Sequence, residues 1–123
     1  NGVIQTRELE YCIRESMDNL NLAGVFTSLS SKCDGCLALR SIVAAYDFYE
    51  ELVERLLDDM TAMMVNLNCT DGTVRMNIQM GCREEIAQQV LHGIELPYGS
   101  FRYELMEEDV VIDLTITEGG GAK

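Results

Sequence analysis

The chain has 123 residues, and 47% of them are hydrophobic, which suits one folded domain and excludes an intrinsically disordered chain. It carries 21 acidic against 9 basic residues, a formal net charge of -12. Because phosphate backbones and anionic lipids are bound by clustered Lys and Arg, this balance excludes nucleic acid and direct membrane contact as expected interactions.

The N-terminal end shows no signal peptide, and no apolar run in the chain approaches the ~20 residues of a membrane span. Since the chain opens at Asn1 and not at Met, we expect a fragment of a longer protein. We further expect a cytoplasmic domain, with room for a membrane anchor in the remainder. An odd count of 5 cysteines without a secretion signal predicts reduced thiols.

The first elements are a helix and a strand. Thr6 can cap a helix that stops near Asn21. Its apolar stripe recurs at steps of three and four residues and comprises Leu9, Ile13, Met17 and Leu20. Residues 25–29 are rich in β-formers and predict a strand, and residues 30–35 predict a loop.

Cys33 and Cys36 form a lone C-x-x-C motif at this point of the chain. Zinc would need two more ligands, and the remaining candidates are scattered along the sequence: Cys69, Cys82 and His92. We interpret the motif as a surface turn before a helix, with Gly35 supplying the bend. Zinc or redox chemistry is the alternative.

A long helix is predicted from near Cys36 to Met60, and residues 44–60 are its most amphipathic part. Its broad apolar face implies burial against a sheet and comprises Leu39, Ile42, Val43, Tyr46, Tyr49, Leu52, Val53, Leu56, Leu57 and Met60. Asp58 and Asp59 lie in the last turn, where the helix dipole disfavours negative charge. Unfavourable charges at a helix end can mark a functional site, or they can mark a helix end that frays.

Residues 63–68 and 73–80 predict a hairpin, because Asp71-Gly72 between them is a strong signal for a tight turn. The second of these strands alternates between apolar and polar residues, so the sheet has one packed and one solvated face. Residues 83–92 predict a short helix, and residues 101–105 and 110–116 a second hairpin. Gly119, Gly120 and Gly121 predict a frayed tail.

The order of these elements predicts an α/β (α+β) two-layer sandwich, with a mixed, mostly antiparallel sheet and the helices on one face. From about Thr6 to Thr117 the chain resembles the GHKL-type, Bergerat-like ATP-binding domain of sensor histidine kinases. Residues 46–79 are especially similar to sensor kinases of clostridial-type bacteria. The resemblance implies one ATPase-like domain over residues 1–123, at the C-terminal end of a longer sensor kinase.

In that family the long helix carries a Glu and a magnesium-binding Asn on one face, about four residues apart. The resemblance places this face near Glu51, Arg55 and Asp59, and a shift of one or two residues stays open. The magnesium-binding Asn is missing in every such register. Arg55 at its position would repel a cation.

The family next has a D-x-G-x-G box and a long glycine-rich lid over the phosphates. Here the corresponding residues run from Gln79 to Arg83 without an Asp, and only Gly81 matches a glycine. A helix follows directly, so the lid is missing. We therefore expect Glu51, Arg55, Asp59 and Gly81 to be remnants of a nucleotide pocket, with no catalytic residue, metal ligand or cofactor.

These expectations leave three functions open. The first is a signal-transduction domain of a sensor histidine kinase with impaired or lost ATP binding, whose partners are other domains of the same kinase or a kinase partner. The second is a divergent but active ATP-binding kinase domain, which would use ATP and magnesium. The third is a stand-alone protein-interaction module with the same sandwich. A homodimer is compatible with each, and whether the chain is an enzyme stays undecided.

Overall fold

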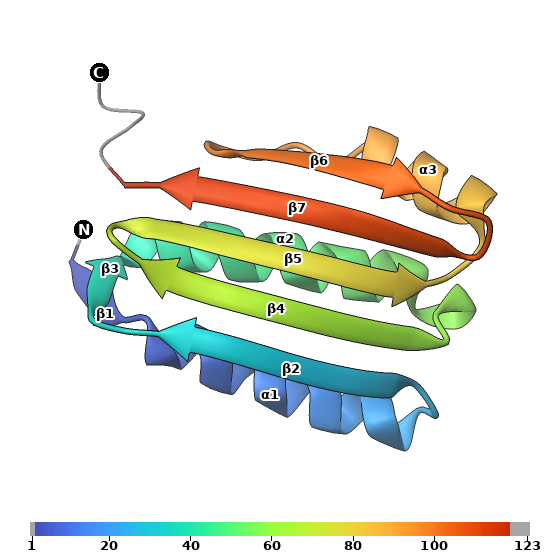
Figure 1. Cartoon of the computed structure of the whole chain (residues 1–123), viewed down its shortest axis with the longest axis horizontal. Coiled ribbons are helices and arrows are strands. Elements are labelled where there is room, and N and C mark those ends of the chain that lie inside the picture. Colours follow the sequence, from blue (N-terminus) through green and yellow to red (C-terminus); the bar gives the residue numbers. More distant parts are fainter. Residues whose placement is uncertain (1, 119–123) are drawn as a thin grey trace.

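A five-stranded sheet forms one layer of the protein (Figure 1). The computed structural model describes residues 2–118. In the order in which they pair, the strands are β2 (Phe26–Cys33), β4 (Ala62–Thr70), β5 (Thr73–Gly81), β7 (Asp109–Thr117) and β6 (Ser100–Leu105). β2 runs parallel to β4, and the other neighbours are antiparallel.

The helices α1 (Arg7–Leu22), α2 (Leu39–Leu56) and α3 (Glu84–His92) form the second layer. All of them lie behind the sheet in Figure 1. Among the described residues, no helix is both long and apolar enough to cross a membrane. The predicted two-layer sandwich with a mixed, mostly antiparallel sheet and helices on one face is confirmed.

The core lies between these layers, and most of it follows the predicted periodicity. The predicted stripe of α1 is buried, as are Val74, Met76, Ile78 and Met80 on β5. On α2 the buried face is rotated from the predicted one. Val43 is 45% exposed, whereas Phe48, which was not predicted, is 2% exposed. The Phe48 ring packs at a tilt against Phe101 of β6, with 5.0 Å between the ring centroids.

Three predicted boundaries are wrong. The segment predicted as a loop after residue 29 continues as β2 to Cys33, because each residue pairs with β4. Cys36 does not begin a helix; it begins β3 (Cys36–Ala38), which pairs with β1 (Val3–Gln5) in a separate two-stranded sheet. The long helix ends at Leu56 and is followed by the 3-10 turn η1 (Leu57–Asp59).

Two turns were predicted correctly from their glycines. Asp71 and Gly72 have φ values of 55° and 73°, the positive pair that a type I′ hairpin turn requires. Gly35 has a φ of 74° and bends the chain between Cys33 and Cys36. The predicted glycine tail at residues 119–121 lies outside the described residues.

Thr6 precedes α1, as predicted, but its side chain does not cap the helix. The hydroxyl donates to the Gly35 carbonyl at 3.3 Å, and the Thr6 backbone N–H donates to the same oxygen at 2.9 Å. Thr6 is 1% exposed. It therefore fastens the start of α1 to the turn between Cys33 and Cys36.

Candidate functional site

The four residues predicted as pocket remnants lie toward one end of the molecule, where α2 stops and α3 begins (Figure 1). Glu51 and Arg55 lie on the last turns of α2, Asp59 lies in η1, and Gly81 is the last residue of β5. The backbone N–H of Thr61, just after η1, donates to the Gly81 carbonyl at 2.9 Å. The fold thus places the end of η1 directly against the end of β5.

Arg55 is paired within its own helix and lies against the far end of α3. Its Nη1 donates to Glu51 Oε2 at 3.1 Å, with both side chains roughly two-fifths exposed. A Cβ atom added to Gly93, the residue that follows α3, would lie 3.9 Å from Arg55 Nη2. A guanidinium at the C-terminal end of a helix is favourable, because the last carbonyls carry partial negative charge.

Asp59 holds the opposite end of α3. Its Oδ2 accepts a hydrogen bond from the backbone N–H of Arg83 at 2.6 Å, and its Oδ1 accepts one from Arg83 Nε at 2.8 Å. Arg83 is the N-cap residue of α3. These bonds lower the pKa of the Asp59 carboxyl and raise that of the Arg83 guanidinium. A carboxylate at the start of a helix also matches the positive end of its dipole.

Gly81 lies in close contact with Thr61. A Cβ atom at this position would lie 2.4 Å from Thr61 Oγ1, which is far inside van der Waals contact. The Thr61 hydroxyl also donates to the Gly81 carbonyl at 3.3 Å. The structure therefore accounts for a glycine here through its contact with Thr61.

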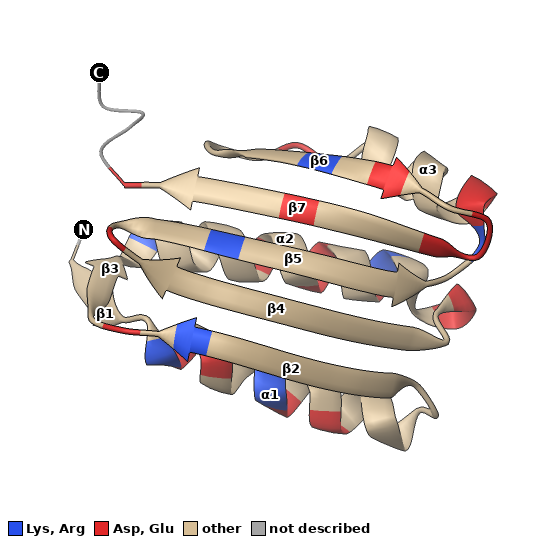
Figure 2. Ribbon diagram, viewed as in Figure 1, with Lys and Arg blue, Asp and Glu red and all other residues tan. Residues whose placement is uncertain are grey.

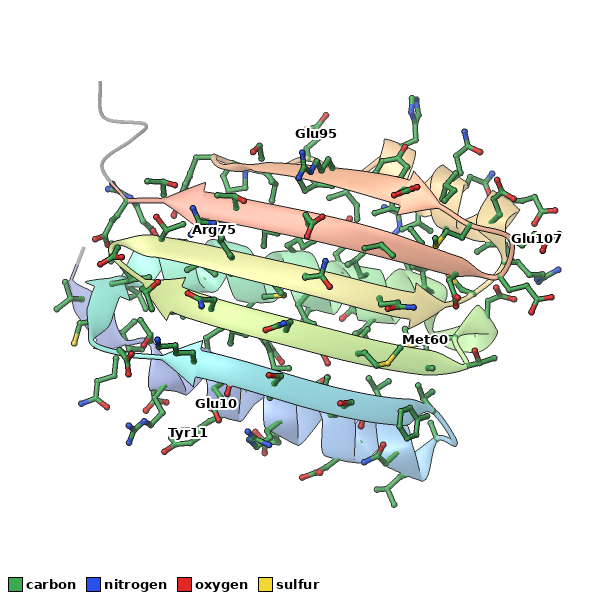
Figure 3. The ribbon with its side chains drawn as sticks, in the orientation of Figure 1. Glu10, Tyr11, Met60, Arg75, Glu95 and Glu107 are labelled. Carbon is green, nitrogen blue, oxygen red and sulfur yellow. The ribbon has the colours of Figure 1, made fainter. Side chains whose placement is uncertain are left out.

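The carboxylates of neighbouring segments gather around this end of the molecule (Figure 2). They come from η1, the first turn of α3 and the β6–β7 turn: Asp58, Asp59, Glu84, Glu85, Glu107, Glu108 and Asp109. Figure 3 shows Glu107 at this end, where β6 turns into β7. The nearby cations are Arg55 and Arg83, and each already has a carboxylate partner.

A magnesium–nucleotide group does not fit these side chains. Both oxygens of Asp59 already bind Arg83, and Arg55 is a cation that pairs with Glu51. Among the described residues, no group of three or more His, Cys, Asp or Glu side chains has an arrangement that could hold a metal ion. α3 begins at Glu84, directly after β5 ends at Gly81, with only Cys82 and Arg83 between them.

His92, the only histidine of the chain, is exposed in the last turn of α3. Met60, Met63, Met76 and Met80 are buried in the core. Met64 points to the other side of the sheet and is 36% exposed.

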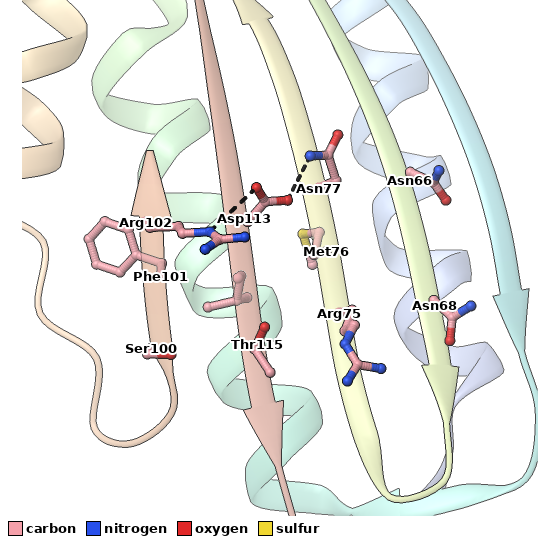
Figure 4. Close-up of a pocket in the computed structure, with 11 residues that line it drawn as sticks. Asn66, Asn68, Arg75, Met76, Asn77, Ser100, Phe101, Arg102, Asp113 and Thr115 are labelled. Carbon is pink, nitrogen blue, oxygen red and sulfur yellow. Dashed lines mark hydrogen bonds and ion pairs between the residues drawn. The ribbon is translucent and has the colours of Figure 1, made fainter. Parts of the chain in front are cut away.

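A second feature, on the uncovered face of the sheet, was not predicted as a cluster. It is a shallow hollow of about 600 Å³ (Figure 4). Polar side chains that line it come from β4, β5, β6 and β7: Asn66, Asn68, Arg75, Asn77, Ser100, Arg102, Asp113 and Thr115. The alternation of β5 already indicated that Arg75 and Asn77 point outward, but the neighbours from β7 depend on strand pairing.

Asp113 connects the polar side chains of this hollow. It accepts a hydrogen bond from Asn77 Nδ2 at 2.7 Å, and its other oxygen lies 4.0 Å from Arg102 Nε. The dashed lines in Figure 4 mark both contacts. The hollow is open and polar, and such a surface can exchange hydrogen bonds with a partner.

Comparison with protein-family models finds no match, and comparison with curated proteins also finds none. Solved structures do match. Histidine kinase AdeS of Acinetobacter baumannii superposes with a TM-score of 0.61 at 8% identity, over 97% of this chain and 68% of AdeS. The nucleotide-free catalytic domain of histidine kinase ThkA gives 0.60 at 11% identity, over 95% of this chain and 96% of that domain.

ThkA in complex with the response regulator TrrA also matches, with a TM-score of 0.56 at 12% identity. That alignment covers 99% of this chain and 43% of the ThkA chain. Identities this low carry information on the fold and not on the activity. The chain therefore has the fold of the catalytic domains of histidine kinases.

Proposed function

We propose that this chain is the signal-transduction domain of a sensor histidine kinase and that its ATP binding is impaired or lost. The fold supports the first part of the proposal. One observation carries the second part: Asp59, at a position expected to face nucleotide and metal, binds Arg83 at the start of α3 through both of its carboxylate oxygens. A carboxylate engaged in this way is not available to bind magnesium. Arg55, the other residue expected to face the metal, is a cation paired with Glu51.

Electrostatics supports the same conclusion. A triphosphate carries several negative charges, and sites that bind it supply backbone N–H groups, a metal ion or basic side chains. The end of the molecule at Gly81 is instead surrounded by carboxylates. Because the nearby cations Arg55 and Arg83 are already paired and the carboxylates outnumber them, this end of the molecule repels a polyphosphate.

In this proposal the domain acts through contacts. Its expected partners are other domains of the same sensor kinase or a separate kinase, with the chain as the C-terminal part of the longer protein. ThkA, which has the same fold, is found in complex with a response regulator, so a regulator is a further candidate. The uncovered polar face of the sheet is available for such contacts.

A divergent but active ATP-binding domain is the second candidate. Glu51 favours it, because a glutamate stands where the resembling family uses one. The pair that Glu51 makes with Arg55 is exposed, and exposed pairs of this kind contribute little to stability. A nucleotide that brought its own magnesium would need only to break that pair.

Calorimetric titration of the purified chain with ATP and with ADP, each with magnesium, separates the two candidates. We expect no binding heat at millimolar nucleotide. Micromolar binding would contradict the loss of ATP binding and favour the divergent active domain.

In that second case Glu51→Ala should weaken the binding. Glu10→Ala is the matched control, because Glu10 makes the same i,i+4 pair with an arginine on α1. An equal effect of both variants would place the nucleotide away from Glu51.

A further inference from the structure

Cys33 and Cys69 lie directly opposite each other on neighbouring strands. They are register partners in the parallel pairing of β2 with β4. Paired residues of adjacent strands point to the same face of the sheet, and here both thiols face the helices, with Cys69 0% exposed and Cys33 packed against the core. The sequence had left Cys69 apart from the C-x-x-C motif, and the fold brings it to Cys33.

The spacing of the two residues suits a covalent bond. Neighbouring strands lie about 4.8 Å apart, within the Cα–Cα range of roughly 4.4–6.8 Å that disulfides span. Both cysteines are free. The backbone N–H of Asp34 donates to the Cys69 carbonyl at 3.3 Å, so the pairing of the strands continues past Cys33 and fixes the opposition of the two side chains.

Cys33 is also reachable from solvent. It lines a hollow of about 220 Å³ together with Gln5, Arg7, Asp34, Gly35 and Cys36. The hydrogen bonds from Thr6 to the Gly35 carbonyl hold one wall of this hollow in place. A small oxidant can therefore approach the Cys33 sulfur while Cys69 stays shielded behind it.

The thiols of the chain differ in their readiness to ionise. Hydrogen bonding with Cys69 lowers the pKa of the Cys33 thiol, against the opposing effects of burial and nearby carboxylates. Burial raises the pKa of Cys82 to about 11 and raises that of Cys12. Since the thiolate is the reactive form, oxidation should favour Cys33 over Cys12 and Cys82.

We propose that Cys33 and Cys69 form a reversible dithiol–disulfide site that responds to small hydroperoxides. The site is independent of the nucleotide pocket and of the proposed signalling function. Disulfides in reducing compartments are usually transient and redox-sensing, which suits a pair of which one member is accessible.

The chemistry balances with hydrogen peroxide as the oxidant. The Cys33 thiolate attacks one peroxide oxygen, the O–O bond breaks, and Cys33 becomes a sulfenic acid while the other oxygen leaves as hydroxide, which takes up a proton to become water. The Cys69 sulfur then attacks the sulfenic sulfur, the S–O bond breaks, and a second water leaves. Overall, two thiols lose two electrons and two protons, and the peroxide is reduced to two waters.

The bond would tie the edge strand β2 to the interior strand β4 and close a loop that contains α2. Cross-linking across a long loop stabilises the folded state mainly by restricting the unfolded chain. Oxidation should therefore raise the melting temperature by several degrees, and a thiol reductant should reverse the rise.

Peptide mapping of the whole chain tests the proposal. The reduced protein is treated with hydrogen peroxide, its free thiols are blocked with N-ethylmaleimide, and it is digested without reductant for mass spectrometry. We expect a Cys33–Cys69 linked peptide within single chains that disappears on treatment with dithiothreitol. A Cys33–Cys36 link, links only between chains, or no link at all would overturn the proposal.

Cys36→Ser is the matched control and should keep both the linked peptide and the rise in melting temperature. Cys33→Ser should lose both. In Cys69→Ala, Cys33 should stop at the sulfenic acid, which dimedone labels. Cys69 is buried, so the Cys69→Ala variant can fail to fold. The peptide maps of the wild type and of Cys36→Ser are therefore sufficient to test the proposal.

Discussion

Asp59 accepts two hydrogen bonds from Arg83, one from the backbone N–H and one from the side chain, at 2.6 and 2.8 Å. The pair joins η1, at the end of α2, to the N-cap residue of α3. Backbone N–H groups at the start of a helix have no partner within the helix. Asp59 therefore acts as an N-terminal cap that is supplied by another element.

Replacement of this carboxylate should loosen α3 more than the rest of the protein. We expect Asp59→Asn to lower the melting temperature by a few degrees and to speed hydrogen exchange in residues 84–92. The exposed neighbour Asp58 supplies the matched control, and Asp58→Asn should leave both unchanged. If α3 were equally protected from hydrogen exchange in Asp59→Asn and in the wild type, Asp59 would not stabilise this helix.

The contribution of Asp59 should vanish in acid. Arg83 lowers the pKa of the Asp59 carboxyl in the folded state, relative to a value near 3.9 in the unfolded chain. Such a group stabilises the fold above the unfolded pKa, and that stabilisation is lost as the pH falls through the folded pKa. The difference in melting temperature between the wild type and Asp59→Asn should be constant from pH 7 to pH 5 and shrink below about pH 4. A difference that is undiminished at pH 2 would contradict this assignment.

Gly81 should tolerate a side chain only if Thr61 gives way. The added methyl group of Gly81→Ala would lie 2.4 Å from Thr61 Oγ1, so we expect a loss of about 1–3 kcal/mol in the free energy of unfolding, typical of an overpacked site. In a Thr61→Ala background the same change should cost much less, because the remaining contacts, with Ala62, are 3.5 Å or longer. Chemical denaturation of the four variants measures this coupling. Additive effects would show that Gly81 serves a purpose other than its contact with Thr61.

The fold was predictable where the spacing of apolar residues within one strand or helix determines which side faces the core. The alternation from Val74 to Met80 and the stripe of α1 depend only on which face meets the core, so both were found from the sequence. The end of β2 was missed, because its serine-rich residues become strand only through pairing with β4. The buried face of α2 was misplaced for a similar reason: Phe48 packs against Phe101, a residue far along the chain.

The assignment of Glu51, Arg55, Asp59 and Gly81 to a nucleotide pocket stays a prediction. The contacts that these residues make were not predictable from the sequence. The partner of Asp59 is Arg83, which is distant in sequence and carries no motif of its own. Contacts of this kind are set by how α3 packs on α2, and a single sequence contains no local signal for them.

Arg55 should contribute more than an exposed helix pair does. Arg14 and Arg55 each pair with a glutamate four residues earlier, at 2.8 and 3.1 Å, and a pair of this type contributes about 0.3–0.5 kcal/mol. Arg55 also lies against Gly93 at the end of α3, whereas Arg14 is 54% exposed on α1. Arg55→Ala should therefore lower the free energy of unfolding more than Arg14→Ala does, and it should speed hydrogen exchange at residues 90–92, the last turn of α3. If the two variants matched in both measurements, Arg55 would be an ordinary surface residue, free to meet a ligand, and the divergent ATP-binding domain would become the better proposal.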